Sequence, residues 1–312
     1  MKLSYYTDSL AHLSLEEVLQ RITQQGVYYI ELATGGWSPA PHLNLTELLT
    51  SETAVLKLQN LLATYQVEIV ALNCSGNPLD PRDIGKQHRE ITINTFKLAE
   101  ILGVKKIVMM SGLPPATPGD TMPNWITTTM SWPPELKEAL TYQWEEIAIP
   151  YWRELVPIAK QHGIEKIALE NHGTQLVYNP ETLLKLRHAV DPIIGMNLDP
   201  SHMFWMGGDP IQSARKLTGA IHHMHGKDLR IEEGPAALNT ILETKDIYDT
   251  KNRAWNYVAV GHGHDLQWWK SFFSVVRMCG YDDFVSLEME DFTMSPEDGV
   301  DISIKALQQV VV

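Results

Sequence analysis

The second half of the chain contains four short runs, Ile167-Ala-Leu-Glu170, Gly195-Met-Asn-Leu-Asp199, Ile221-His-His-Met-His225 and Val285-Ser-Leu-Glu288. Each run ends on a residue that can bind a metal ion, directly after an apolar residue. Side chains alternate across a β-strand, so the last residue faces the side opposite to its apolar neighbour. The shared phase predicts four consecutive strands that present Glu, Asp, His and Glu on one side at their carboxyl ends.

Apolar runs alternate with longer amphipathic stretches along the whole chain. The predicted strands are 3–7, 27–32, 67–73, 105–110, 164–170, 193–199, 220–225 and 283–289. The predicted helices lie near 14–25, 46–65, 84–102, 135–162, 179–190, 209–217, 266–278 and 296–310. Eight strand–helix pairs favour parallel strands with crossover connections. No G-x-G-x-x-G follows the first strand, which weighs against a dinucleotide-binding open sheet. The pattern predicts an α/β fold of the (β/α)8 barrel type.

The length and composition fit a single domain. The chain has 312 residues, of which 44% are hydrophobic, and this is enough for one buried core. No Pro-, Gly- and Ser-rich linker marks a boundary. We therefore expect one barrel over 1–312, with loop insertions near 112–135 and 228–257.

The charge and the cysteine content exclude several classes of function. With 25 basic and 38 acidic residues, the net charge is −13, which repels nucleic-acid phosphates. No run approaches the roughly 20 apolar residues of a membrane span, and the N-terminus lacks the apolar stretch of a signal peptide. Cys74 and Cys279 are the only cysteines. We expect a cytoplasmic protein that binds neither nucleic acid nor membrane.

The four strand-end residues predict a metal site. A single Glu or His at a strand end is often only hydrogen-bonded or loop-facing, but four in one phase favour a common ligand. Glu170, Asp199, His225 and Glu288 are mostly hard donors, which suit Mn²⁺, Mg²⁺ or Co²⁺, and Zn²⁺ also fits. A cation also explains how three carboxylates can lie close together while ionised.

These motifs resemble the sugar phosphate isomerase/epimerase superfamily, also called the xylose isomerase-like or AP-endonuclease-2-like barrels. The resemblance rests on Leu169-Glu170-Asn171, Asn197-Leu-Asp199-Pro-Ser-His202, His223-Met-His225-Gly-Lys-Asp228, Arg253-Ala-Trp-Asn-Tyr257 and Ser286-Leu-Glu288-Met-Glu290-Asp291. It implies one divalent metal ion, most often Mn²⁺, held by the same four residues. It also implies that Glu170 and Glu288 act as the catalytic acid/base pair on opposite faces of the substrate.

Further residues follow the predicted ligands closely enough to contact a substrate. The resemblance implies that His202 contacts a substrate oxygen or a second metal, whereas the alternative is a histidine bonded to a loop carbonyl. Some related ketose epimerases carry an arginine after the seventh strand. Here Arg230 is the nearest arginine and Lys227 could serve instead, while Arg230 as a solvated loop charge is equally consistent with the sequence.

Other candidates come from loops and from the first half of the chain. His264 lies in a Gly-rich loop, where substrate binding and simple loop bonding are both consistent with the sequence. Glu31 and Asn73 fall at strand ends and are expected to line the pocket. By strand parity, His223 faces the barrel and is expected to support a metal ligand.

We therefore expect a metal-dependent isomerase or epimerase that abstracts a proton next to a carbonyl of a small sugar or keto-sugar. The alternative is a lyase or dehydratase on the same barrel, acting on inososes, dehydroshikimate or 3-keto-glycosides. An abasic-site endonuclease is disfavoured, because such enzymes use three zinc ions and further histidines. A non-catalytic binding barrel is disfavoured by the complete ligand set. The resemblance also allows a homodimer or homotetramer.

Overall fold

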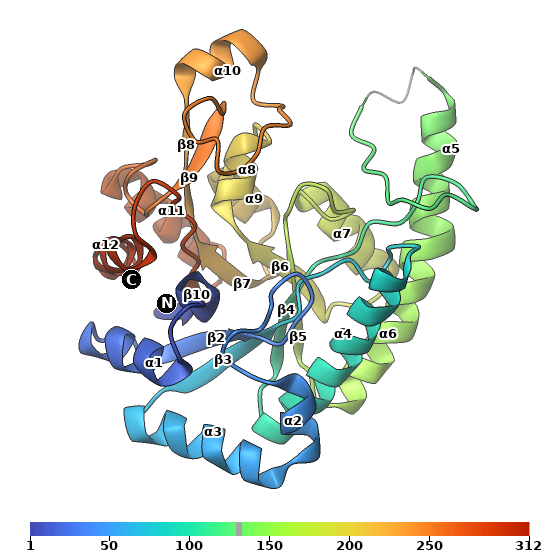
Figure 1. The fold of residues 1–312 in the computed structure, drawn as a ribbon. Helices are drawn as coiled ribbons and strands as arrows, with labels where there is room; N and C mark the ends of the chain where they lie inside the picture. The colour runs from blue at the N-terminus through green and yellow to red at the C-terminus, as the bar shows by residue number, and fades with distance from the viewer. Residues whose placement is uncertain (129–132, 312) are drawn as a thin grey trace. The chain divides into compact units, whose positions relative to one another are not determined.

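The barrel predicted from the sequence is present in the computed structural model, which describes residues 1–128 and 133–311 (Figure 1). Eight strands close into a barrel in the order β1-β10-β7-β6-β5-β4-β3-β2, and β8 and β9 form a separate two-stranded sheet. The strands are β1 (Lys2–Tyr6), β2 (Tyr29–Ala33), β3 (Glu68–Asn73), β4 (Lys106–Met109), β5 (Lys166–Glu170), β6 (Ile194–Leu198), β7 (Ile221–Gly226), β8 (Asp228–Ile231), β9 (Trp255–Val258) and β10 (Phe284–Leu287).

Helices connect the strands, as expected for a parallel barrel. They are α1 (Leu15–Gln24), α2 (Leu45–Thr50), α3 (Glu52–Tyr65), α4 (Asp83–Leu102), α5 (Glu135–Thr141), α6 (Ile149–Gln161), α7 (Pro180–Ala189), α8 (Pro200–Trp205), α9 (Pro210–Lys216), α10 (Glu233–Asn239), α11 (Leu266–Met278) and α12 (Pro296–Gln308). A 3-10 turn, η1 (Thr7–Leu10), follows β1, and a π-helical turn, η2 (Tyr142–Ala148), joins α5 to α6.

Local capping explains why these helices begin where they do. Ser14 forms a capping box with Glu17 at the start of α1. The predicted helix over 46–65 is interrupted at Ser51, whose backbone is extended (φ −134°, ψ 106°). The Ser51 hydroxyl accepts a hydrogen bond from the Ala54 N–H and so starts a second helix. A serine can cap a helix as well as continue one, so the periodicity alone did not reveal the break.

The chain divides into two compact units. The first comprises Met1–Glu31, Asn60–Val70 and Leu198–Val312, and the second comprises Leu32–Gln59 and Ala71–Asn197. In the first unit, β10 pairs in parallel with both β1 and β7, and Ser286 lies opposite His225. The aromatic side chains of Trp269, Phe272 and Phe273 on α11 are fully buried in this unit.

The second unit contains β4 and β5 with their partners. Strand β5 pairs in parallel with β4 and with β6, and Glu170 lies opposite Asn197 in the β5–β6 register. The small residues Ala71, Val108 and Ala168 pack together without exposure. Small side chains let neighbouring strands share a tightly packed interior.

The two predicted insertions have different structures. Between 112 and 128 the chain forms neither helix nor strand, and residues 129–132 lie outside the described part. By contrast, the second segment is not a plain loop, because β8 and β9 pair antiparallel and α10 lies between them. Figure 1 shows this segment in orange, extending beyond the end of β7. Among the described residues, no helix combines the length and apolar character needed to cross a bilayer.

Candidate metal centre

Three of the predicted ligands come together at the carboxyl ends of β6, β7 and β10. Asp199 directly follows β6 and caps α8, where its Oδ1 accepts the Ser201 N–H at 2.7 Å. His225 lies in β7, and Glu288 directly follows β10. One potential ligand atom from each of Asp199, His225 and Glu288 lies within 4.8 Å of the others. The alternation of side chains along these strands therefore brings three possible metal-binding groups close together.

The contact between His225 and Glu288 fits a metal site. His225 Nδ1 lies 2.8 Å from Glu288 Oε2. Both atoms are buried, and neither is aligned for a hydrogen bond with any residue that the structure describes. Two buried ligand-type atoms that converge as an ion pair outside regular hydrogen-bond geometry match two ligands of one cation.

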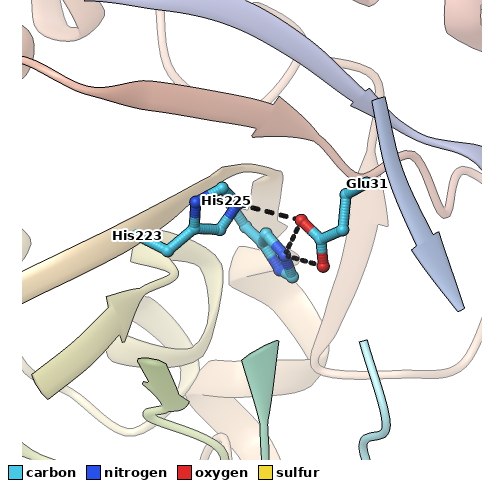
Figure 2. A group of neighbouring side chains, drawn as sticks. All are labelled: Glu31, His223 and His225. Carbon is cyan, nitrogen blue, oxygen red and sulfur yellow. Dashed lines mark hydrogen bonds and ion pairs between the residues drawn. The ribbon is translucent and has the colours of Figure 1, made fainter. Parts of the chain in front are cut away.

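The other nitrogen of the His225 ring is held by Glu31 (Figure 2). His225 Nε2 lies 3.2 Å from both carboxylate oxygens of Glu31, and His223 Nε2 lies 2.9 Å from Oε2. Glu31 is an acceptor only, so both histidines donate their Nε2–H groups to it. Because Nε2 donates to Glu31, Nδ1, the atom that faces Glu288, is the ring nitrogen left for a cation, which would replace a proton there.

The network continues below the histidines. Ser286 Oγ lies 2.9 Å from His223 Nε2 and 2.9 Å from Ser4 Oγ. Glu31, His223 and His225 are themselves close enough to hold a metal ion. However, Glu31 already lies at hydrogen-bond distance from both histidines, and Ser286 Oγ also lies at hydrogen-bond distance from His223 Nε2. We interpret the group as the support of His225.

The charges around His225 favour a positive charge at this point. Burial lowers the pKa of His225, but the carboxylates of Glu31 and Glu288 outweigh burial and hold its pKa well above the usual value. Burial raises the pKa of Glu31, yet His225 and His223 outweigh it and keep Glu31 ionised. A bound cation would be stabilised by the same carboxylates.

Lys227 lies beside the second oxygen of Glu288. Its Nζ is 3.2 Å from Glu288 Oε1, 2.7 Å from Glu290 Oε2 and 4.3 Å above the centre of the Tyr257 ring. Burial lowers the pKa of Lys227, but the two glutamates outweigh burial and hold its pKa well above the usual value. The two oxygens of Glu288 thus have separate partners, with Oε2 facing His225 and Oε1 facing Lys227.

His202 lies on α8, one turn after Asp199, and is almost fully buried. Its Nδ1 accepts the Trp205 Nε1–H at 3.2 Å and lies 3.3 Å from the Tyr257 hydroxyl. Its Nε2 lies 3.5 Å from Asp199 Oδ2. Burial lowers the pKa of His202 to about 4, so the ring is neutral near pH 7.

A family model described as the xylose isomerase-like TIM barrel matches residues 19–310. The chain belongs to this family. A relative, YfiH of Bacillus subtilis (strain 168), is described as uncharacterized and is 60% identical over 311 residues, which is 100% of this chain and 99% of YfiH. The resemblance seen in the strand-end motifs is thereby confirmed.

Two solved structures have the same fold as this chain. The probable 3-DHS dehydratase AsbF from Bacillus anthracis has a TM-score of 0.68 at 20% identity, with 99% of each chain covered. A D-tagatose 3-epimerase-like protein has a TM-score of 0.65 at 21% identity, covering 99% of this chain and 98% of that one. At these identities the likeness extends to the fold alone.

His264 is anchored by an aspartate that the sequence did not single out. Its Nδ1 lies 2.8 Å from Asp228 Oδ1, and its ring stacks on Phe204 with 3.8 Å between centroids. Asp228 Oδ2 also accepts backbone N–H groups from Gly261, Gly263 and His264. The His-Gly-Lys-Asp motif contains Asp228, but only the folded loop shows what it binds.

The remaining predicted residues lie in separate surroundings. Arg230 is exposed on β8 and pairs with Glu232 at 2.7 Å. In the second unit, Asn73 ends β3, and its Oδ1 accepts the Ser75 N–H and closes a turn. Glu170 is buried as the last residue of β5. Its place in the metal site stays a prediction, as do the substrate contacts of Arg230 and Asn73.

Proposed function

We propose that this protein is a metal-dependent enzyme that moves a proton next to a carbonyl of a small sugar or keto-sugar. In this proposal, Glu170, Asp199, His225 and Glu288 hold one divalent cation. The observation that carries the proposal is the buried contact between His225 Nδ1 and Glu288 Oε2, with Glu31 binding the opposite ring nitrogen. A histidine oriented by a carboxylate is the usual arrangement at a protein metal site.

Glu170 is assigned as the fourth ligand because of its position on β5. It ends its strand, is buried, and lies opposite Asn197, two residues before Asp199. In a parallel barrel, consecutive strands end at the same mouth, where active sites lie. Three carboxylates and one imidazole favour Mn²⁺, with Mg²⁺, Co²⁺ and Zn²⁺ as the other candidates.

The cation, when bound, supplies polarisation of the carbonyl and of a neighbouring hydroxyl. The protein residues then handle the proton. Glu170 and Glu288 exchange it on opposite faces of the substrate. Glu288 Oε1 is the oxygen suited to this step, because Oε2 faces His225. Lys227, at 3.2 Å, stabilises the ionised form of Glu288 and keeps Oε1 in place.

A second candidate function is dehydration by the same initial proton abstraction. It is favoured by Lys227, whose ammonium group lies beside Glu288 and would stabilise the charge on a departing hydroxyl. It also agrees with the fold that this chain shares with a probable dehydratase. The two reactions differ in whether water leaves the substrate.

The test combines metal content with solvent exchange. Mass spectrometry of the untagged protein should find about one Mn, Co, Mg or Zn per chain, and a Glu170→Gln, Glu288→Gln double variant should lose it. With ketoses and keto-sugars in deuterated water, isomerisation incorporates deuterium without loss of water, whereas dehydration yields an unsaturated product. Glu181→Gln, an exposed substitution on α7, is the control. If neither Mn²⁺ nor Zn²⁺ binds on addition, the proposal fails.

A further inference from the structure

His202 lies between a metal ligand and two aromatic donors. On one side, its Nε2 is 3.5 Å from Asp199 Oδ2. On the other, the Trp205 indole N–H donates to Nδ1 at 3.2 Å, and the Tyr257 hydroxyl lies 3.3 Å from the same atom. Both ring nitrogens therefore have fixed neighbours in a fully buried setting.

These contacts determine which nitrogen carries the proton. An indole N–H can only donate a hydrogen bond, so His202 Nδ1 must present its lone pair to Trp205. A proton on Nδ1 would place two hydrogen-bond donors, the His202 Nδ1–H and the Trp205 indole N–H, opposite each other without an acceptor. The proton therefore lies on Nε2, the atom facing Asp199. In this tautomer, the Nδ1 lone pair is engaged and Nε2 has none, so the ring cannot bind a metal ion.

The donors are themselves held by the segment between β7 and α11. Trp205 stacks on Trp255 of β9, with 5.4 Å between centroids and 9° between the ring planes. The Arg253 guanidinium lies 4.0 Å from the centre of the Trp255 ring. Tyr257, also on β9, packs under Lys227 at 4.3 Å. The β8–β9 segment thus supplies the side chains that keep Trp205 and Tyr257 against His202.

We infer that His202 is a positioning residue, locked as the Nε2–H tautomer by Trp205 and Tyr257, and that it consequently does not bind a second metal ion beside Asp199. The inference rests on the proposed function for the first ion. In this role His202 supports the Asp199 carboxylate electrostatically, and the β8–β9 segment belongs to the metal site although it contributes no ligand. A site without a second ion at His202 suits polarisation of adjacent substrate oxygens and not the multi-zinc chemistry of abasic-site endonucleases.

Two measurements on the full-length protein test this inference. Long-range ¹⁵N–¹H correlation spectra of ¹⁵N-histidine-labelled protein report the tautomer, both without metal and with Mg²⁺, and His202→Asn identifies the resonance. Titration with Mn²⁺, followed by electron paramagnetic resonance, counts bound ions and detects a coupled pair. The test variant is Trp205→Phe with Tyr257→Phe, which removes both donors and keeps the rings. The control is Trp268→Phe with Tyr248→Phe, which removes the same groups away from His202.

The wild type and the control should show Nε2–H and bind one Mn²⁺ per chain. The test variant should show Nδ1–H in part of the molecules and bind Mn²⁺ about tenfold more weakly. A wild-type ring protonated on Nδ1, or a second Mn²⁺ that disappears in His202→Asn, overturns the inference. Failure of every protein to bind Mn²⁺ overturns the proposed function and the statement about a second ion with it, while the tautomer spectrum still decides separately whether His202 is locked.

Discussion

At the scale of single residues, the site depends on which nitrogen each histidine presents. His225 and His202 are both buried and both lie beside carboxylates, yet their partners assign them opposite roles. Glu31 accepts the Nε2–H of His225, which leaves Nδ1 for the cation of the proposed site. Trp205 takes the lone pair of His202 and removes that ring from the ligand set. In the proposed site, the ligand His225 and the positioning residue His202 are thus distinguished by the hydrogen-bond donors and acceptors around them.

Glu31→Gln tests the first of these assignments. The amide keeps the shape of the side chain, but its NH₂ group is a donor and cannot accept a hydrogen bond from the Nε2–H of either His225 or His223. We expect Mn²⁺ affinity to fall by about 10–100-fold, as is usual when the support of a ligand is altered. Isothermal titration with Mn²⁺ gives the affinity. Glu68→Gln, an exposed change at the start of β3, should behave as wild type. Unchanged affinity in Glu31→Gln would show that Glu31 does not orient His225.

Cys74 gives a prediction that depends on pH. Burial raises the pKa of the Cys74 thiol from its ordinary value of 9.0 to about 12, although hydrogen bonds with Thr92 and Thr95 oppose the rise. Since the thiolate is the reactive form, the native protein should react with a disulfide reagent at pH 8 far more slowly than the unfolded protein. Rapid labelling of Cys74 in the native state, measured against Cys74→Ser, would contradict the assigned burial.

The same shift predicts a loss of stability in alkali. A thiol with a raised folded pKa contributes stability that is fully present below its unfolded pKa of about 9.0. This contribution is lost as the pH rises through the folded value of about 12. The melting temperature of the wild type should therefore fall more steeply over this range than that of Cys74→Ser.

At the scale of elements, the loop before α11 is organised around one carboxylate. Asp228, at the start of β8, accepts backbone N–H groups from Gly261, Gly263 and His264, and a fourth contact comes from the His264 ring. Gly263 allows this approach, because a Cβ there would lie 2.1 Å from the carbonyl oxygen of Leu229. The close approach of the loop to β8 therefore requires a glycine.

Gly263→Ala should therefore disturb this loop. The added methyl group has to displace backbone, and overpacking of this kind costs about 1–3 kcal/mol. We expect a lower midpoint in urea unfolding and faster exchange of the amides at 261, 263 and 264. Gly234→Ala, where a Cβ meets open space within α10, is the matched control and should not destabilise the protein. Equal midpoints for the two variants would argue against the tight loop.

At the scale of the whole molecule, metal binding should be visible as added stability. A ligand that binds only the folded chain stabilises it by mass action, by about 2.7 kcal/mol at 100 times its Kd. We expect Mn²⁺ to raise the melting temperature by several degrees and a chelator to reverse the effect. Glu288→Gln should abolish the shift, because it removes one ligand of the proposed site. Glu181→Gln should leave it unchanged. A shift of equal size in Glu288→Gln would mean that the metal binds elsewhere.

Much of this molecule follows from the sequence alone. Alternation along a strand is a local property, so the apolar residues before Glu170, Asp199, His225 and Glu288 suffice to predict a common orientation, which for Glu170 stays a prediction. The repeated strand and helix signals were enough for the barrel, which the structure and the family match confirm. Both depend on patterns within a few neighbouring residues.

Interactions between distant segments decided the rest. Glu31 meets His223 and His225, and Trp255 meets Trp205, only after the chain has folded. The pairing of β8 with β9 likewise joins strands on either side of α10, in a segment that the sequence predicted only as a loop insertion. The proton position on a buried imidazole depends on the donors and acceptors that surround it, and these come from different strands and helices. The sequence therefore predicted which residues could bind a metal, while the tertiary structure decided which nitrogen of His225 faces the proposed site and engaged both nitrogens of His202 elsewhere.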